Sequence, residues 1–121
     1  MSDVQMLHNP RCSKSRETLA LLLQHGETPQ VVLYLEQAHT KEMIRSLLDK
    51  LDFNDPRYLM RTNESVYKEL GLDQVVGDAL IDAMVVHPIL IERPIVICGN
   101  SARIGRPPER VLEILPTSSI D

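Results

Sequence analysis

Apolar residues along this chain fall into two patterns, short unbroken runs and helical spacings, and the two patterns alternate. The unbroken runs are of strand length and predict strands at residues 4–8, 31–35, 95–98 and 102–104. Apolar positions three or four residues apart predict helices at residues 13–25, 40–51, 57–63, 65–70, 79–86 and 109–115. Strands and helices that alternate in this way are typical of α/β proteins.

Residues with special backbone preferences mark the ends of these elements. Thr40 precedes one helical pattern and Asp78 precedes another, so each is predicted to cap its helix. Gly99 predicts the turn of a hairpin between the last two strands. Residues 31–35 are apolar without alternation, and this pattern predicts a strand buried on both faces.

The order of the elements narrows the fold class. A strand, a helix and a parallel strand, followed later by a hairpin and a helix, form the thioredoxin-type arrangement. We therefore predict one α/β domain over residues 1–121, with a thioredoxin-like mixed four-stranded sheet. The helical turns at about residues 54–88 would be an insertion in that fold.

Charge and composition exclude several classes of protein. The 121 residues carry a net charge of −4, which argues against nucleic-acid and membrane-surface partners. The first residues show no signal-peptide pattern, and no apolar stretch approaches the ~20 residues of a transmembrane helix. Two widely spaced cysteines do not form a disulfide framework. We expect a cytoplasmic monomer.

The strongest chemical signal is Cys12, in the motif HNPRCSKSR at residues 8–16. It stands where a predicted strand leads into a predicted helix, and unpaired N–H groups at a helix N-terminus lower a thiol pKa and can hold an oxyanion. His8, Arg11 and Lys14 would also favour the thiolate. Polar neighbours predict a thiol at the surface, although a free cysteine is often a small buried hydrophobe.

A second thiol is missing from the position where a dithiol motif would have it. Ser15 replaces the second cysteine of a CxxC pair, so it cannot form a disulfide but can donate a hydrogen bond to the thiolate. Cys98 ends a predicted strand and is expected in the core. A resolving role for Cys98 would require its Cα within about 7 Å of the Cα of Cys12.

Three arginines stand beside turns or prolines instead of on a helix face, namely Arg61, Arg93 and Arg106. Guanidinium groups bind oxyanions through two hydrogen bonds and keep their charge, so three of them around one thiolate would form an oxyanion site. Pro94 follows Arg93 and begins a predicted strand, and in thioredoxin-like folds a proline at this place is usually cis and faces the reactive cysteine, so we expect a cis peptide here. Other arginines are expected to be solvated or locally paired, namely Arg16, Arg103 and Arg110.

Several common kinds of site are absent from the sequence. Zinc sites need Cys and His at short spacings, which Cys12 and Cys98 do not provide, so we predict no metal site. A Cys-x5-Arg phosphatase loop would need an arginine at Thr18. No glycine-rich nucleotide loop is present.

The chain resembles the glutaredoxin-coupled arsenate reductases of the thioredoxin fold over nearly all of residues 4–115. The matching segments are HNPRCSKSR at 8–16, VVLYLE at 31–36, LMRTNE at 59–64, ELGL at 69–72, LIDAMVVHPILIERPIVI at 80–97 and RIGRP at 103–107. The first motif and the HPILIERPI stretch are highly specific in combination.

The resemblance implies an activity and a set of roles. Cys12 would attack arsenate, three arginines would bind the oxyanion, and His8 and Ser15 would favour the thiolate. By the same resemblance those arginines are Arg61, Arg93 and Arg106. Glutathione would be a co-substrate and glutaredoxin a partner, and no bound cofactor is implied.

Two other classes of function remain open on the sequence alone. A monothiol oxidoreductase would use Cys12 on glutathione mixed disulfides, although such a substrate does not need three cations. A non-catalytic interaction protein of the same fold would lack a low-pKa thiol. A related transcription regulator uses a CxxC switch, which Ser15 argues against.

Overall fold

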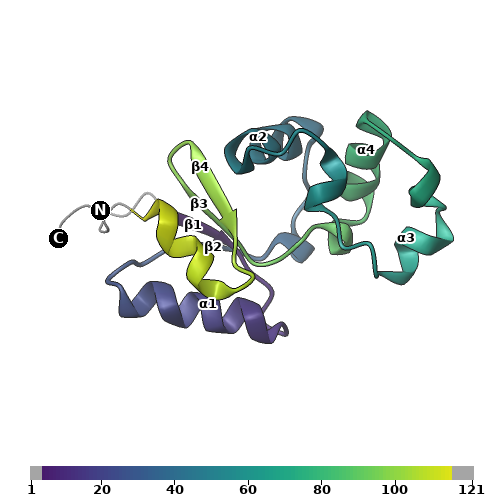
Figure 1. Ribbon diagram of the computed structural model, residues 1–121. Coiled ribbons are helices and arrows are strands. Elements are labelled where there is room, and N and C mark those ends of the chain that lie inside the picture. The colour runs from purple at the N-terminus through teal and green to yellow at the C-terminus, as the bar shows by residue number, and fades with distance from the viewer. Residues whose placement is uncertain (1–3, 116–121) are drawn as a thin grey trace. The chain divides into compact units, whose positions relative to one another are not determined.

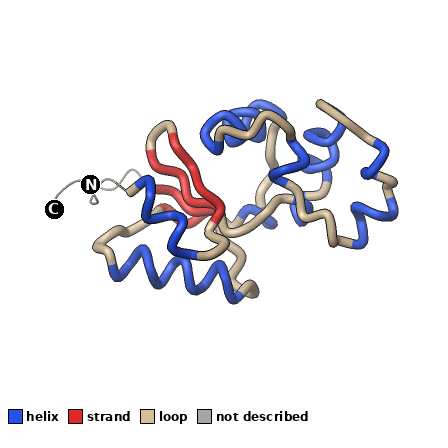
Figure 2. The backbone as a smooth tube through the Cα atoms, in the orientation of Figure 1, coloured by secondary structure: helices blue, strands red, loops and turns tan. Residues whose placement is uncertain are grey.

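The computed structural model describes residues 4–115, which belong to two compact units. The first unit combines Met1–Tyr34 with Arg93–Asp121, and the second is Leu35–Glu92. All four strands of the described residues lie in the first unit, whereas helices occur in both (Figures 1 and 2).

The first unit is built on a mixed four-stranded sheet, as the sequence predicted. Its strands are β1 (Val4–Leu7), β2 (Gln30–Val32), β3 (Ile95–Cys98) and β4 (Ser101–Ile104), in the order β2-β1-β3-β4. The strand β1 is parallel to β2 and antiparallel to β3, and β4 pairs with β3 as the predicted hairpin.

Two helices pack side by side on the first unit's sheet. They are α1 (Ser13–Gln24) and the 3-10 helix η5 (Pro108–Ile114), which replaces the α-helix expected near 109–115. The residues that form their shared core with the sheet are Val4, Met6, Leu22, Val96, Val111 and Leu115. Each buried aliphatic side chain contributes about 1.5–3 kcal/mol, so this core holds α1 firmly on the sheet.

At one edge of the sheet, the ends of two strands lie beside the start of a third. Leu7 lies opposite Ile95, and Ile95 lies opposite Ile104, so β1 ends where β3 begins and β4 ends. The loop after β1 therefore starts beside the loop that enters β3 and the loop that leaves β4. Segments far apart in the sequence are brought together at this edge.

The predicted strand at 31–35 differs from the observed one. β2 has three residues, and the chain then turns into the short 3-10 helix η1 (Tyr34–Glu36). β2 lies at an edge of the sheet and Val31 is 41% exposed, so the strand is not buried on both faces. The apolar run has a second cause, because Tyr34 leaves the strand and is fully buried.

The second unit is helical. Its α-helices are α2 (Lys41–Leu51), α3 (Ser65–Glu69) and α4 (Asp78–Val86), joined by the 3-10 turns η2 (Pro56–Leu59), η3 (Leu72–Gln74) and η4 (Pro88–Leu90). The unit includes residues on both sides of the predicted insertion at 54–88, because α2 packs against α4. That the whole chain is a single domain stays a prediction.

Two local predictions in the second unit need correction. The helix expected at 57–63 is only the turn η2, because Met60 leaves it to form an isolated antiparallel bridge with Ile91. Asp78 does not cap α4, since Gly77 occupies the cap position. The carboxylate of Asp78 instead accepts a 2.8 Å hydrogen bond from Arg45 on α2.

Arg57, which is half-buried, links the loops of the second unit through its guanidinium group. The Arg57 guanidinium donates to the carbonyl of Leu72 at 3.0 Å and also contacts the Val75 carbonyl and the Tyr67 hydroxyl. The guanidinium thereby adds a charged donor to the Leu72 carbonyl, which also accepts the N–H of Val75 at 3.1 Å.

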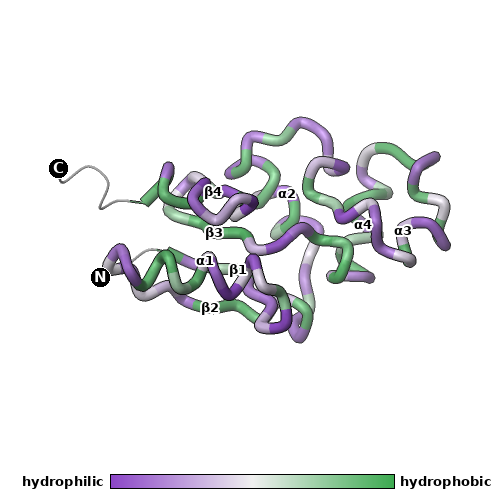
Figure 3. The backbone as a smooth tube through the Cα atoms, turned by 60° about the horizontal axis from the view of Figure 1, so that its bottom comes forward, coloured by the Kyte–Doolittle hydropathy of each residue, from purple (hydrophilic) through white to green (hydrophobic). Residues whose placement is uncertain are grey.

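Hydropathy follows the same division between core and surface. In Figure 3, β3 is apolar along its length, whereas polar and apolar residues alternate along α1. Within residues 4–115, none of the helices has the length and apolar character needed to cross a membrane.

The cap of α2 provides a test of the second unit. The Thr40 hydroxyl oxygen accepts the N–H of Met43 at 3.1 Å, as predicted for an N-cap. Thr40→Ala should lower the free energy of unfolding by about 1 kcal/mol, because this N–H loses its partner. Urea unfolding followed by circular dichroism measures the change, with the exposed Thr62→Ala as the control. Equal stability of the two variants would contradict the cap.

Candidate active site

The loop after β1 turns sharply to place Cys12 at the start of α1. His8 N–H donates to the Val32 carbonyl at 2.9 Å, which continues the pairing of β1 with β2. Cys12 N–H donates to the Asn9 carbonyl at 2.9 Å, which closes the turn. The Cys12 carbonyl then accepts the N–H of Arg16 at 3.0 Å, so Cys12 is the N-cap residue of α1.

The Cys12 thiol is more buried than its polar neighbours predicted. Cys12 is only 9% exposed, although Arg11 and Ser13 on either side of it are exposed. Sequence neighbours are a poor guide here because the loop curls back on itself and the Arg106 guanidinium lies 3.7 Å from the sulfur. The expectation of a surface thiol was therefore wrong.

The pKa of Cys12 lies below its ordinary value despite this burial. Burial raises the pKa because it penalises the thiolate. The backbone N–H of Ser15 and the positive charge of Arg93 are the two largest of the causes that lower the pKa. The N–H of Lys14 and a hydrogen bond from Arg93 lower the pKa further. The thiol makes no capping hydrogen bond of ordinary length, so these N–H groups act on sulfur at longer range.

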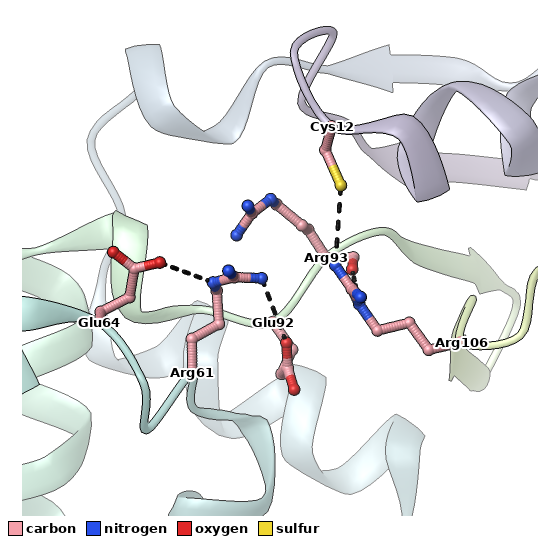
Figure 4. A network of polar contacts seen from close by, with 6 residues as sticks. All are labelled: Cys12, Arg61, Glu64, Glu92, Arg93 and Arg106. Atoms are coloured by element: carbon pink, nitrogen blue, oxygen red, sulfur yellow. Dashed lines mark hydrogen bonds and ion pairs between the residues drawn. The ribbon is translucent and has the colours of Figure 1, made fainter.

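Arg93 and Arg106 approach the same sulfur and are linked to each other. Nη2 of Arg106 lies 3.7 Å from Sγ of Cys12, while its Nε donates to the Arg93 carbonyl at 2.7 Å (Figure 4). The Arg93–Pro94 peptide is cis, as predicted, and the Arg106–Pro107 peptide is cis as well. Both arginines are brought to Cys12 by the sheet edge at which β3 begins and β4 ends.

Arg93 keeps donors that no protein group uses. Its Nε and Nη1 atoms are buried and have no hydrogen-bond partner among the described residues. Leaving such donors unpaired costs on the order of 1–3 kcal/mol each. Beside a thiolate, unpaired guanidinium donors are suited to an anionic ligand that would satisfy them.

His8 and Ser15 form a buried pair beneath the loop. His8 Nδ1 lies 2.7 Å from Ser15 Oγ, and Ser15 Oγ also accepts the N–H of Asn9 at 3.0 Å. Burial, and then the charge of Arg16, lower the pKa of His8, so its ring is neutral near neutral pH. His8 therefore supplies no positive charge to the thiolate. The Ser15 hydroxyl is engaged by this pair, and Ser15 acts on sulfur through its backbone N–H.

The other charges of the motif do not act as expected. Lys14 is exposed at its ammonium group and pairs with Glu17 at 3.7 Å, and Arg11 is exposed. Neither side-chain charge contributes to the lowered pKa of Cys12. Arg16 donates to the Pro10 carbonyl at 2.9 Å, the local pairing that the sequence predicted.

Arg61 belongs to the second unit and has acidic partners there. Its Nε lies 3.0 Å from Glu64 and its Nη1 lies 3.8 Å from Glu92 (Figure 4). The N–H of Arg61 donates to the Leu90 carbonyl at 2.7 Å, which fixes its backbone beside the Met60–Ile91 bridge. A role for Arg61 at the thiol stays a prediction. Two further arginines pair locally with Glu113, namely Arg103 and Arg110.

Cys98 lies at the opposite end of the hairpin from the site. It pairs with Ser101, three residues away from the Ile95–Ile104 end where Arg93 and Arg106 approach Cys12. At about 3.4 Å per residue this separation is about 10 Å, beyond disulfide geometry. Cys98 packs against the core cluster, as expected.

The described residues contain no cluster of three or more His, Cys, Asp or Glu side chains that would hold a metal ion. The site is a nucleophile with cationic donors, and its chemistry is that of a thiolate facing an anion.

Fold and site together define a thioredoxin-like α/β protein in which a single N-capping cysteine lies beside two arginine side chains. A sequence model of the ArsC family matches residues 7–114, and the chain belongs to that family.

Relatives and solved structures agree with this assignment. The chain is 51% identical to an arsenate reductase of Haemophilus influenzae, over 93% of this chain and 98% of that protein. It is 55% identical to the uncharacterized protein YfgD of Escherichia coli K12, over 93% and 96%. A solved arsenate reductase from Vibrio cholerae, also 55% identical, superposes with a TM-score of 0.90 over 93% of this chain and 97% of that one. The predicted thioredoxin-like fold is thus confirmed.

The arginine beside the thiol generates a test. Arg93→Met should move the midpoint of Cys12 alkylation by iodoacetamide to higher pH, because removing a nearby cation disfavours the thiolate. Mass spectrometry of the Cys12 peptide separates its reaction from that of Cys98. Arg11→Met, which removes an exposed charge from the neighbouring position, should leave the midpoint unchanged. Equal shifts in both variants would contradict a specific role for Arg93.

Proposed function

We propose that this protein is an arsenate reductase in which the Cys12 thiolate attacks arsenate bound by arginine side chains. The observation that carries the proposal is a thiol of lowered pKa beside Arg93, whose buried Nε and Nη1 have no hydrogen-bond partner within residues 4–115. The arsenate reductase names of the relatives support the same substrate.

The donors around sulfur match a tetrahedral oxyanion. Arg93 offers two unused N–H directions, and Arg106 places a second guanidinium beside the thiol. The N–H groups at the start of α1 add the positive end of the helix dipole. We assign Arg61 as the third oxyanion-binding arginine, which would have to share its charge between the substrate and Glu64 or Glu92.

The first chemical step forms a thiol–arsenate adduct. The Cys12 thiolate forms an S–As bond, and one As–O bond breaks, with the oxygen leaving as water after it gains a proton. Arsenic remains pentavalent in this step. Arsenic accepts thiolate attack far more readily than phosphorus does, so phosphate would bind to the same donors without turnover.

The next two steps use glutathione and then glutaredoxin. A glutathione thiolate attacks the Cys12 sulfur, an S–S bond forms, and the S–As pair of electrons stays on arsenic, which leaves as trivalent arsenite. A glutaredoxin thiolate then attacks the glutathione sulfur and releases Cys12. No bound cofactor is needed, and we place the reaction in the cytoplasm, where glutathione is plentiful.

We assign His8 and Ser15 to holding the loop. Their 2.7 Å contact and the bond from Asn9 N–H fix the start of α1, so the N–H groups of Lys14 and Ser15 stay directed at sulfur. In this reaction the pair preserves the thiolate through geometry.

Replacement of the nucleophile is the decisive experiment. The purified protein should reduce arsenate with glutathione and glutaredoxin, and Cys12→Ser should abolish turnover because serine forms no thiol adduct. Arsenite production measures the rate, and Cys98→Ser serves as the matched control with retained activity. Arsenate reduction by Cys12→Ser would refute the scheme. No turnover by the wild type, despite a reactive thiol, would favour an oxidoreductase of glutathione mixed disulfides.

Replacing any one of the oxyanion-binding arginines should lower kcat/KM strongly. Arg93→Ala and Arg106→Ala should each lower kcat/KM by about 30- to 1,000-fold, equivalent to about 2–4 kcal/mol for one preorganised oxyanion donor. Arg61→Ala should fall in the same range if it binds the substrate. Steady-state kinetics with Arg103→Ala as the control test this, since Arg103 pairs with Glu113. A loss smaller than about threefold would remove that arginine from the site.

A further inference from the structure

Gly105 lies where three parts of the site meet. It follows β4, directly precedes Arg106, and is buried. Its N–H donates to the Pro94 carbonyl at 2.9 Å. This hydrogen bond links the residue that precedes Arg106 to the residue that follows Arg93. The N–H of Arg106 in turn donates to the Ile104 carbonyl at 2.9 Å, which makes a tight turn around Gly105.

A side chain at Gly105 has no room. A Cβ atom there would lie 2.7 Å from Oγ1 of Thr18 and 2.9 Å from Cγ of Pro94. Carbon atoms pack at about 3.5–4.0 Å, so the contact with Pro94 would be strongly repulsive. The contact with the Thr18 oxygen is shorter still, and real Cβ atoms essentially never approach another heavy atom below 3.0 Å. Gly105 does not have a positive φ, and the need for glycine is therefore one of space and not of backbone conformation.

The neighbours that Gly105 touches cannot simply turn aside. Thr18 is fully buried on α1, and its hydroxyl donates to the Lys14 carbonyl at 2.8 Å. Pro94 is buried, and its ring is closed onto the backbone, so the ring cannot rotate away from the contact. A larger residue at position 105 would therefore move α1, the Arg93–Pro94 peptide, or both.

Each of these movements would reach the Cys12 sulfur. The first turn of α1 supplies the N–H groups of Lys14 and Ser15, and the peptide carries Arg93. Arg106 reaches Sγ at 3.7 Å from the position directly after Gly105. We propose that Gly105 is a positioning residue, whose missing side chain sets the spacing among the start of α1, Arg93 and Arg106. This inference rests on the proposed oxyanion chemistry for its functional meaning.

The test replaces Gly105 with alanine and reads out the thiol itself. Gly105→Ala should move the midpoint of Cys12 alkylation by iodoacetamide to higher pH, because the cation and N–H groups move away from sulfur. His8 also lies under this loop, but its neutral ring contributes no charge to compensate. Inorganic phosphate should protect Cys12 from alkylation only at concentrations about tenfold higher or more, since a displaced binding group loses its geometry.

A second glycine of the same hairpin provides the matched control. Gly99 lies in the β3–β4 turn with φ +59° and nothing within 4 Å of its added Cβ. Gly99→Ala should lower the urea midpoint of unfolding because alanine is strained at this φ, yet leave the alkylation midpoint and the phosphate protection unchanged. An equal shift of the alkylation midpoint in Gly99→Ala would overturn the proposal, since lost stability alone would then explain the effect.

A double variant keeps the proposal testable even if Gly105→Ala does not fold. Thr18→Ala removes the atoms at 2.7 and 3.3 Å and leaves the Pro94 contact at 2.9 Å. The double variant Thr18→Ala/Gly105→Ala should therefore fold, with an alkylation midpoint between those of Thr18→Ala and the ordinary thiol. A midpoint equal to that of Thr18→Ala would overturn the positioning role.

The thiol readout also separates the two proposals. Expected shifts in a protein that does not reduce arsenate would leave the positioning role intact and refute the proposed function. Arsenate reduction by the wild type, with an unshifted alkylation midpoint in a folded Gly105→Ala protein, would support the proposed function and refute the positioning role.

Discussion

The site depends on keeping a sulfur anion in a place where burial opposes charge. Cys12 is largely covered, and that cover alone would raise its pKa. The compensation comes from the first turn of α1 and from Arg93, which lies outside that helix. The sheet is what joins these two sources, because β1 ends at the edge where β3 begins. The fold thus solves an electrostatic problem that no single segment of the chain solves.

The two kinds of arginine show how the same side chain serves different ends. Arg57 donates hydrogen bonds to carbonyl groups of its own unit, and Arg103 forms an ion pair with Glu113. Arg93 differs from both because two of its buried nitrogen atoms have no protein partner among the described residues. The guanidinium donors of a structural arginine are hydrogen-bonded to protein groups, whereas those of a ligand-binding arginine lack such partners until the ligand binds. That contrast, and not the presence of arginine, marks the position of the site.

Local sequence signals were enough for the frame of the site but not for its interior. The strand–loop–helix around Cys12 followed from the apolar runs, and the cis peptide at Pro94 followed from the place that a proline has in thioredoxin-like folds. The approach of Arg106 to Cys12 and the crowding of Gly105 by Thr18 join segments about 80 or more positions apart, which no local pattern encodes. Ser15 illustrates the limit, since its spacing to Cys12 suggested a hydroxyl contact while the structure directs that hydroxyl to His8. The exposure of β2 at the sheet edge could not be predicted for a similar reason. Tyr34 extends the apolar run of β2 in the sequence, but it lies outside the strand and is buried, whereas Val31 in the strand is exposed.

The far placement of Cys98 has a consequence for how the protein handles electrons. A protein with a second thiol close to its reactive cysteine can form an internal disulfide when it is oxidised, and it can remain in that state until it is reduced. Here Cys98 is about three strand residues from the site end of the hairpin, so the chain has no such internal disulfide. In the proposed reaction every pair of electrons must arrive from a separate molecule during the same cycle. The turnover of this protein is then a direct measure of the thiol supply around it, and scarcity of that supply would leave Cys12 blocked by its last substrate.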